Sequence, residues 1–371
     1  MEFVGREAAG VVSVACSSSS HTSFATLSAH GTLTLWDLRL RRRNYLSVDN
    51  PNAAARTEAS ELCYFQDRHA AVALCGNAVQ LFDTRKSVSV VAEYVHPKEC
   101  VAFLKTPPPS DAATTLLVDE DGGMFPFNLA DGTRTDVMEA YVLGRPCALP
   151  TGEDVLGHLS NYCSGLHCID VSSGGGGSTE VSSRVLLAVG MDGSGALYAG
   201  TEDKDHIPNN TTRTIERVPF SVMEAPQKHQ TAQVVNPPLV NCTAVCRSAL
   251  AVGRADSTYT VYHVRRDGPE ALFEAPGHAV NGLCYVDWLS PDVLITTSLC
   301  GEVTGWNVGG FLAAEDEEEE EGDLPEVVTA FSHREVPGCQ LATVNCGDRL
   351  GEHSYVFGDH MGGVTLARVE L

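Results

Sequence analysis

Residues 24–39 decide the fold of this chain, and they read Phe-Ala-Thr-Leu-Ser-Ala-His-Gly-Thr-Leu-Thr-Leu-Trp-Asp-Leu-Arg. Residues 26–29 predict a strand of small side chains, and His30-Gly31 supplies the chemistry of a tight turn. Residues 32–36 alternate polar and apolar side chains, several of them β-branched or large, which predicts a second strand. Trp36-Asp37 closes this hairpin, and a further apolar strand is predicted just before it, at 10–16.

The same order of signals recurs along the chain: an apolar strand, a small-residue strand, a Gly or Asn turn, and a strand that usually ends in an aromatic residue. The last strands of the units close at Trp36, Phe82, Phe127, Tyr198, Tyr262, Trp306 and Ala367. The shorter spacings between them, about 44 to 46 residues, match the period of propeller blades. The longer ones contain a Gly run at 174–177, a polar stretch at 201–237 and an acidic run at 315–321, which we interpret as insertions.

These repeats predict an all-β fold, a single seven-bladed β-propeller of the WD40 type. The last unit lacks an outer strand, and residues 3–4 are left over before the first unit. We therefore expect the N-terminal strand to complete the last blade and close the ring, which removes exposed sheet edges. The predicted blades are 5–50, 51–95, 96–143, 144–220 with the Gly-rich loop, 221–275, 276–332 with an acidic loop at 314–323, and 333–371 together with 1–4.

Composition narrows the classes of function. The length of 371 residues allows a sizeable core, and the formal net charge of -23 opposes binding to a phosphate backbone. No stretch has the uninterrupted apolar length of a membrane span, and the N-terminus lacks the basic region and apolar core of a secretory signal. We therefore expect a cytoplasmic and/or nuclear protein, monomeric outside its complex, whose partners are proteins and not nucleic acid or membranes.

The chain contains 13 cysteines, and an odd number in a reducing compartment argues against a disulfide framework. One cysteine lies in or beside the first predicted strand of each unit: Cys16, Cys63, Cys100, Cys168, Cys246, Cys284 and Cys346. This regularity predicts one shared packing role near the propeller axis, where a small apolar side chain fits. Metal binding is the alternative, but the chain has no Cys-x-x-Cys pair, and we expect no metal site.

No residue set predicts catalysis, so we expect neither catalytic residues nor a cofactor. The glycine-rich stretch at 190–200 matches neither a dinucleotide-binding nor a P-loop pattern, and it predicts a blade turn. His158 and His278, each preceded by Gly, predict buried hydrogen-bond networks in units four and six. Asp192 is the expected partner of His158, whereas Cys300 stands where His278 would meet an Asp, which predicts an incomplete network. A hydrolase built on a propeller is a third class of function, because fold does not fix function.

The basic cluster Arg39, Arg41, Arg42 and Arg43 is conspicuous in so acidic a chain. Three interpretations compete: a solvated connector, a nuclear-import patch, or contact of Arg39 with a protein partner.

Two successive units end in Asp-x-Arg, as Trp36-Asp37-Leu38-Arg39 and Phe82-Asp83-Thr84-Arg85. This pattern resembles the WD-x-Arg box of WD40 substrate receptors for cullin 4 ubiquitin ligases. Residues 24–39 match that box except that His30 replaces an acidic turn residue, and residues 70–85 match with Phe82 in place of Trp. The resemblance implies that Asp37, Arg39, Asp83 and Arg85 contact the propeller-type adaptor of the ligase, where Arg can make bidentate hydrogen bonds.

Over most of its length the arrangement also resembles the WD repeat-containing protein 53 family. The points of likeness are the second unit without Trp, Ser-Asn-Tyr-Cys-Ser at 160–164, Asn-Pro-Pro-Leu at 236–239, Gly-His at 277–278 and the acidic insertion before the last unit. The Gly run and the 201–237 insertion depart from it. The resemblance implies a non-catalytic substrate receptor of a cullin-RING ligase. The alternative is a scaffold subunit of another assembly without a ligase role, which docks partners on the top surface of the propeller and on the acidic loop.

Overall fold

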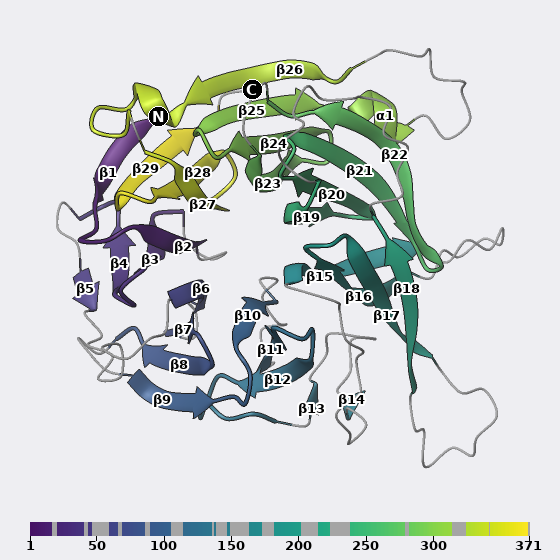
Figure 1. The fold of residues 1–371 in the computed structure, drawn as a ribbon, viewed down its shortest axis with the longest axis horizontal. Helices are drawn as coiled ribbons and strands as arrows, with labels where there is room; N and C mark the ends of the chain where they lie inside the picture. The colour runs from purple at the N-terminus through teal and green to yellow at the C-terminus, as the bar shows by residue number, and fades with distance from the viewer. Residues whose placement is uncertain are drawn as a thin grey trace.

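Antiparallel sheets stand radially around a central axis, and seven of them form the blades of a β-propeller (Figure 1). This computed structural model describes residues 1–16, 21–40, 44–46, 59–65, 69–85, 90–104, 114–135, 137–138, 147–148, 163–172, 182–201, 214–222, 238–278, 282–313, 324–340 and 342–369. The predicted all-β fold and its seven blades are confirmed. Among the described helices, none is long and apolar enough to span a membrane.

Each blade runs from an inner strand at the axis to an outer strand at the rim. Blade one holds β2 (Val11–Cys16), β3 (Ser23–Ser28), β4 (Leu33–Asp37) and β5 (Asn44–Leu46), and blade two holds β6 (Ala59–Phe65), β7 (Ala70–Cys75), β8 (Ala78–Asp83) and β9 (Val90–Val95). Blade three holds β10 (Cys100–Phe103), β11 (Thr114–Asp119) and β12 (Met124–Asn128), and blade four holds β15 (Cys163–Ser172), β16 (Ser182–Gly190), β17 (Ser194–Thr201) and β18 (Thr214–Ser221).

The second half of the chain repeats this plan. Blade five holds β19 (Val240–Cys246), β20 (Ala249–Arg254), β21 (Thr258–Arg265) and β22 (Gly268–Pro276), and blade six holds β23 (Leu283–Ser290), β24 (Val293–Ser298), β25 (Glu302–Asn307) and β26 (Glu326–Ser332). Blade seven holds β27 (Val344–Arg349), β28 (Ser354–Asp359), β29 (Gly363–Arg368) and β1 (Glu2–Arg6). A two-stranded sheet of β13 (Val137–Met138) and β14 (Cys147–Ala148), the short helix α1 (Gly309–Ala313) and the 3₁₀ turn η3 (His333–Glu335) complete the described elements.

The predicted hairpin of blade one forms as β3 and β4. Phe24 pairs with Trp36 and their rings stack with centroids 5.6 Å apart, so the aromatic end of the third strand packs on the second. Gly31 has a φ of +74° in the turn, a conformation that glycine adopts without steric cost. The polar and apolar alternation at 32–36 is therefore accommodated in one register between β3 and β4.

Blade three differs from the others at its outer edge. Its described sheet has three strands, and beyond them Arg134 forms an isolated antiparallel bridge with Phe127. The outer strands predicted at 214–220 and 327–331 are present as β18 and β26. The Gly run, the acidic run and most of the 201–237 insertion lie outside the described residues.

Every inner strand carries a β-bulge near its start, for example between Val11 and Ser13 in β2 and between Val344 and Cys346 in β27. The side chain of the extra residue in a bulge points in a changed direction. In three blades this side chain forms a hydrogen bond to the next blade. These hydrogen bonds run from Ser164 Oγ to the Val240 carbonyl (2.7 Å), from Asn241 Nδ2 to the Leu283 carbonyl (2.9 Å) and from Asn345 Nδ2 to the Val11 carbonyl (3.0 Å). The bulges thus help to join the blades around the axis.

The predicted ring closure is confirmed. β1 pairs antiparallel with β29, with Glu2 opposite Leu366 and Arg6 opposite Gly363, so the N-terminal strand becomes the outer strand of blade seven. Figure 1 shows the purple start of the chain beside its yellow end.

The seven inner-strand cysteines all lie in or against the hydrophobic clusters, which confirms the predicted packing, but they do not share one position in their strands. Relative to the bulge of its strand, Cys100 stands at the first residue and Cys284 within the bulge, whereas Cys16 and Cys246 lie at the strand ends. Each therefore packs in a different setting. Burial, for example, raises the pKa of the Cys100 thiol to about 12.

Candidate protein-interaction site

The first Asp-x-Arg sequence ends β4 in a compact turn. Asp37 Oδ1 accepts hydrogen bonds from the backbone N–H (3.0 Å) and Nε (3.0 Å) of Arg39, and Asp37 Oδ2 accepts one from Arg39 Nη2 (2.7 Å). An Asp side chain that accepts from the backbone two residues later is a local turn, which explains why the strand stops at Asp37. The same carboxylate holds the guanidinium in a bidentate fork.

The second Asp-x-Arg sequence repeats this geometry at the end of β8. Asp83 accepts from the Arg85 backbone N–H (3.0 Å), Nε (2.9 Å) and Nη2 (2.8 Å). The middle residue of each Asp-x-Arg sequence also makes an equivalent backbone hydrogen bond. The Leu38 N–H donates to the Thr22 carbonyl, and the Thr84 N–H donates to the His69 carbonyl. The four predicted residues thus form two local pairs on neighbouring blades.

Both pairs lie on the same face of the propeller. The inner strands of blades one and two meet near their starts, where the Leu62 N–H donates to Ser13 Oγ, and both blades have the same antiparallel strand order, so their third strands end on the same side. The Arg39 side chain is 69% exposed and the Arg85 side chain 64%, whereas their aspartates are 18% and 12% exposed. The hydrogen bond from Arg39 lowers the pKa of Asp37 below its ordinary value. Since exposed ion pairs contribute little to folding, the main effect of each aspartate is to orient an accessible guanidinium. The basic residues Arg41, Arg42 and Arg43 lie outside the described residues.

A hollow of about 450 Å³ lies beside Arg39, where blade seven meets blade one. It is lined by His21, Thr22, Leu38, Arg39, Leu350, Ser354, Leu366 and Arg368. The sequence reasoning missed it, because these residues come from opposite ends of the chain and no local pattern connects them.

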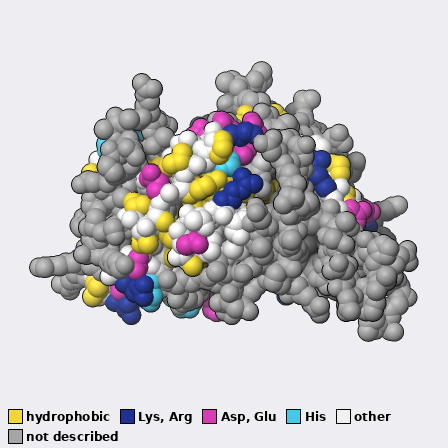
Figure 2. All heavy atoms as spheres, turned by 90° about the horizontal axis from the view of Figure 1, so that it is seen from below, with side chains coloured by type: hydrophobic (Ala, Val, Ile, Leu, Met, Phe, Trp, Pro, Cys, Tyr) yellow, Lys and Arg dark blue, Asp and Glu magenta, His cyan; other side chains and the backbone are white. Residues whose placement is uncertain are grey.

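The rim of the blades is a second exposed surface. In the outer strand β9, Val91 and Val95 are exposed on either side of Glu93, which accepts a hydrogen bond from Gln80. Figure 2 views the rim from the side of blades two and three and shows apolar side chains among scattered acidic and basic ones. Within the part of this surface that the structure describes, we find no repeated pair like the two Asp-x-Arg forks.

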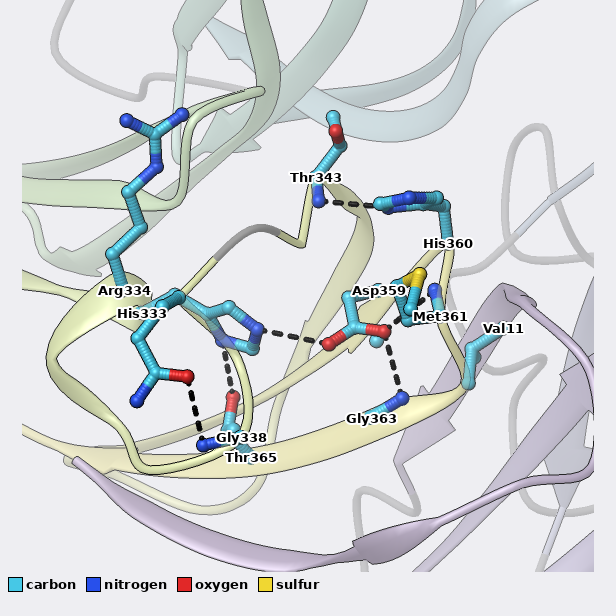
Figure 3. A network of polar contacts seen from close by, with 12 residues as sticks. Val11, His333, Arg334, Gly338, Thr343, Asp359, His360, Met361, Gly363 and Thr365 are labelled. Carbon is cyan, nitrogen blue, oxygen red and sulfur yellow. Dashed lines mark hydrogen bonds and ion pairs between the residues drawn. The ribbon is translucent and has the colours of Figure 1, made fainter.

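The most enclosed polar group lies in blade seven (Figure 3). His333 Nδ1 is 2.9 Å from Thr365 Oγ1, and its Nε2 is 3.1 Å from Asp359 Oδ2. Asp359 Oδ1 accepts from the backbone N–H groups of Met361 (2.8 Å) and Gly363 (2.7 Å). The side chains of His333, Asp359 and Thr365 are fully buried. The sequence reasoning did not single out His333, because no Gly precedes it.

Cys339 places a sulfur near this network, and the ligand atoms of His333, Cys339 and Asp359 all lie within 4.8 Å of one another. His, Cys and Asp are ligands that Zn²⁺ accepts. Both imidazole nitrogens and both carboxylate oxygens are already engaged in hydrogen bonds, so a metal would have to displace them. The geometry fits a structural hydrogen-bond network.

Related networks lie in other blades. In unit six His278 contacts Thr296 Oγ1 (3.1 Å), which also accepts from Trp306 Nε1 (2.8 Å). Cys300 supplies no carboxylate, and the acid near His278 is Glu302, whose Oε2 lies 3.5 Å from His278 Nδ1. In blade three His96 Nε2 lies 3.2 Å from Asp119 Oδ2, a pair that the sequence reasoning missed. In blade one Glu7 takes the place of histidine and accepts from Thr26 (2.9 Å) and Thr34 (3.1 Å). His158 lies outside the described residues, and Asp192 accepts from the Ser194 N–H and hydroxyl within its turn.

No family model matches the chain, and no curated protein matches it significantly. The fold and the exposed forks therefore define the class. The chain is a seven-bladed β-propeller, an architecture typical of protein-interaction scaffolds.

Proposed function

We propose that this protein is a non-catalytic interaction scaffold that acts as a substrate receptor of a cullin 4-type ubiquitin ligase. Arg39 and Arg85 contact the adaptor of the ligase, and Asp37 and Asp83 orient them. The observation that carries the proposal is the repeated geometry of the two forks on one face, with both guanidinium groups about two-thirds exposed. The resemblance of residues 24–39 and 70–85 to the WD-x-Arg box supplies the identity of the partner.

The forks suit this task physically. Each aspartate uses only part of the N–H donors of its guanidinium, and the remaining donors can meet carboxylates or carbonyls of a partner. Because the bidentate pair already orders the long Arg side chain, less conformational entropy is lost when a partner binds. Arg is also enriched among the residues that dominate interface energies.

Replacing both arginines should abolish adaptor binding and leave the fold intact. Hydrogen bonds to charged groups contribute about 1.5–3 kcal/mol each, so we expect Arg39→Ala/Arg85→Ala to recover at least about tenfold less adaptor than the wild type. The measurement is affinity purification of both proteins from cells, scored for the adaptor and the cullin, with a melting temperature for each purified protein.

Arg265→Ala is the matched control. Arg265 ends the third strand of blade five on the same face, is 59% exposed and pairs with Glu270 at 3.1 Å, but it belongs to no Asp-x-Arg sequence. This variant should recover the adaptor as the wild type does. Equal recovery by the double variant would contradict the adaptor contact. Stable recovery of other partners with no adaptor from the wild type would favour a scaffold in another assembly.

A further inference from the structure

The hollow between blades seven and one combines an apolar floor with a cationic rim. Leu350 and Leu366 form the most buried part, with 1% and 2% of their surface exposed, and Leu38 is half-buried. Arg39 and Arg368 lie at the rim together with His21. A volume of about 450 Å³ falls within the range of about 300–1,000 Å³ in which proteins bind small ligands.

The charged side chains that line the hollow are basic, and each of the two arginines also has an acidic neighbour, Asp37 for Arg39 and Glu2 for Arg368. The chain carries a formal net charge of -23, yet the charged groups that line the hollow are two arginines, with a histidine beside them. Arg368 lies 3.7 Å from Glu2, and both side chains are mostly exposed, so this pair is easily exchanged for a partner's carboxylate. An acidic segment is attracted here and repelled by most of the remaining surface.

The apolar part of the lining favours a ligand that carries an apolar group as well as negative charge. Leu38 supplies the accessible apolar surface of the lining, over the buried Leu350 and Leu366. It offers little to a hydrated phosphate or a simple carboxylate, but it can pack against an apolar side chain. Leu40, which follows Arg39 in the chain, is an apolar residue with 53% of its surface exposed. The combination is typical of sites that anchor one bulky side chain and read the charges beside it.

We propose that this hollow receives a bulky apolar side chain from an acidic segment of a partner protein, whose flanking carboxylates bind Arg39 and Arg368. The inference rests on the proposed function in one respect, namely that the face with Arg39 binds protein. It assigns binding residues that lie outside the two Asp-x-Arg sequences: Thr22, Ser354 and Arg368.

The test measures direct binding of defined peptides by fluorescence polarisation. The probe is the labelled peptide Glu-Glu-Asp-Phe-Glu-Glu, and the comparison peptides replace Phe by Gly, replace the acidic residues by Lys, or carry phosphoserine in place of Phe. We expect the full-length wild type to bind the probe at least about tenfold more tightly than any comparison peptide.

Two kinds of variant locate the binding. Ser354→Trp fills the hollow and Arg368→Glu reverses part of its rim, and each should weaken binding of the probe at least about tenfold. Thr22→Trp fills the hollow from another side and replaces Ser354→Trp as the test if that variant melts early. Arg265→Ala, at the end of β21 in blade five and outside the hollow, should bind like the wild type.

Several outcomes would overturn the proposal. They are no binding of the probe, equal binding of the Gly peptide, tighter binding of the phosphoserine peptide, and loss of affinity in Arg368→Glu without loss in a folded Trp variant. Failure of the proposed function is distinguishable, because it appears in the adaptor purification with Arg39→Ala/Arg85→Ala. Peptide binding as expected, without any adaptor in that purification, would retain the hollow and discard the ligase role.

Discussion

Replacing Asp359 by alanine is expected to destabilise the folded propeller by about 3–5 kcal/mol, because it removes one partner of a buried, hydrogen-bonded pair. The carboxylate is fully buried, and its loss leaves the N–H groups of Met361 and Gly363 and the imidazole of His333 without their acceptor. The expected result is a large decrease in the free energy of unfolding at pH 7, measured by urea denaturation.

The pH dependence of this variant follows from the pKa of Asp359. Burial alone would raise that pKa, but hydrogen bonds from His333 and from the Gly363 N–H outweigh it and hold the pKa below the ordinary value of 3.8. Because the pKa of Asp359 is lower in the folded protein than in the unfolded chain, the ionised carboxylate stabilises the fold at pH values above the unfolded-state pKa. This contribution is lost as the pH falls through the folded-state pKa. The wild type should therefore lose more stability than Asp359→Ala between pH 7 and pH 3.

Asp121→Ala is a suitable control, because Asp121 is a mostly exposed aspartate that pairs with Lys98. Its free energy of unfolding should change by no more than about 0.5 kcal/mol. Similar small effects of both substitutions would contradict the importance of the buried network. A fall in the wild-type denaturation midpoint on addition of a chelator would instead identify the group with Cys339 as a metal site.

The second large effect is a gain of stability when Asp287 is replaced by asparagine at alkaline pH. Asp287 lies on the inner strand β23, and its carboxyl group is buried beside the hydroxyl of Tyr355 on blade seven. Burial raises the pKa of Asp287 to about 7, against a lowering effect of Arg349, and the nearby Asp348 raises it further. Arg349 itself donates to the backbone carbonyls of Trp288 and Leu289.

The sign of the effect follows from the direction of the shift. A raised pKa means that the folded protein keeps the proton longer than the unfolded chain, so the contribution of Asp287 is greatest below pH 4 and is lost as the pH rises through about 7. Asn resembles the neutral acid and has no such loss. The change of this pKa from 3.8 to about 7 is equivalent to about 4 kcal/mol, so the advantage of Asp287→Asn should grow by as much as that between pH 4 and pH 8.

Urea denaturation of the wild type and Asp287→Asn at pH 4, 6 and 8 measures this difference directly. Asp292→Asn changes an exposed aspartate in the turn that follows β23, and its free energy of unfolding should stay within about 0.5 kcal/mol of the wild type at pH 8. If the Asp287→Asn and wild-type curves run parallel from pH 4 to pH 8, the carboxyl group is hydrated and ionised in the fold like an ordinary aspartate.

The sequence alone was sufficient for the architecture, because blade hairpins are local. Apolar and polar residues alternate with the period of a strand, and turn residues such as Gly31 mark where the chain reverses, so repeated hairpins can be counted without coordinates. The leftover N-terminal residues then predicted the pairing of β1 with β29. The two Asp-x-Arg sequences could be recognised because each spans three residues, but the pairing of Asp37 with Arg39 and of Asp83 with Arg85 came from the structure.

Only the tertiary structure decided how separate blades meet. The hollow beside Arg39 joins residues from both ends of the chain, and His333 reaches Asp359 across several turns, so no short pattern connects their members. The inner-strand cysteines looked equivalent in the sequence, but the bulges give them different positions. The physical reason is that strand periodicity specifies which face of a sheet a residue occupies, whereas the register and packing between blades specify which side chains then touch.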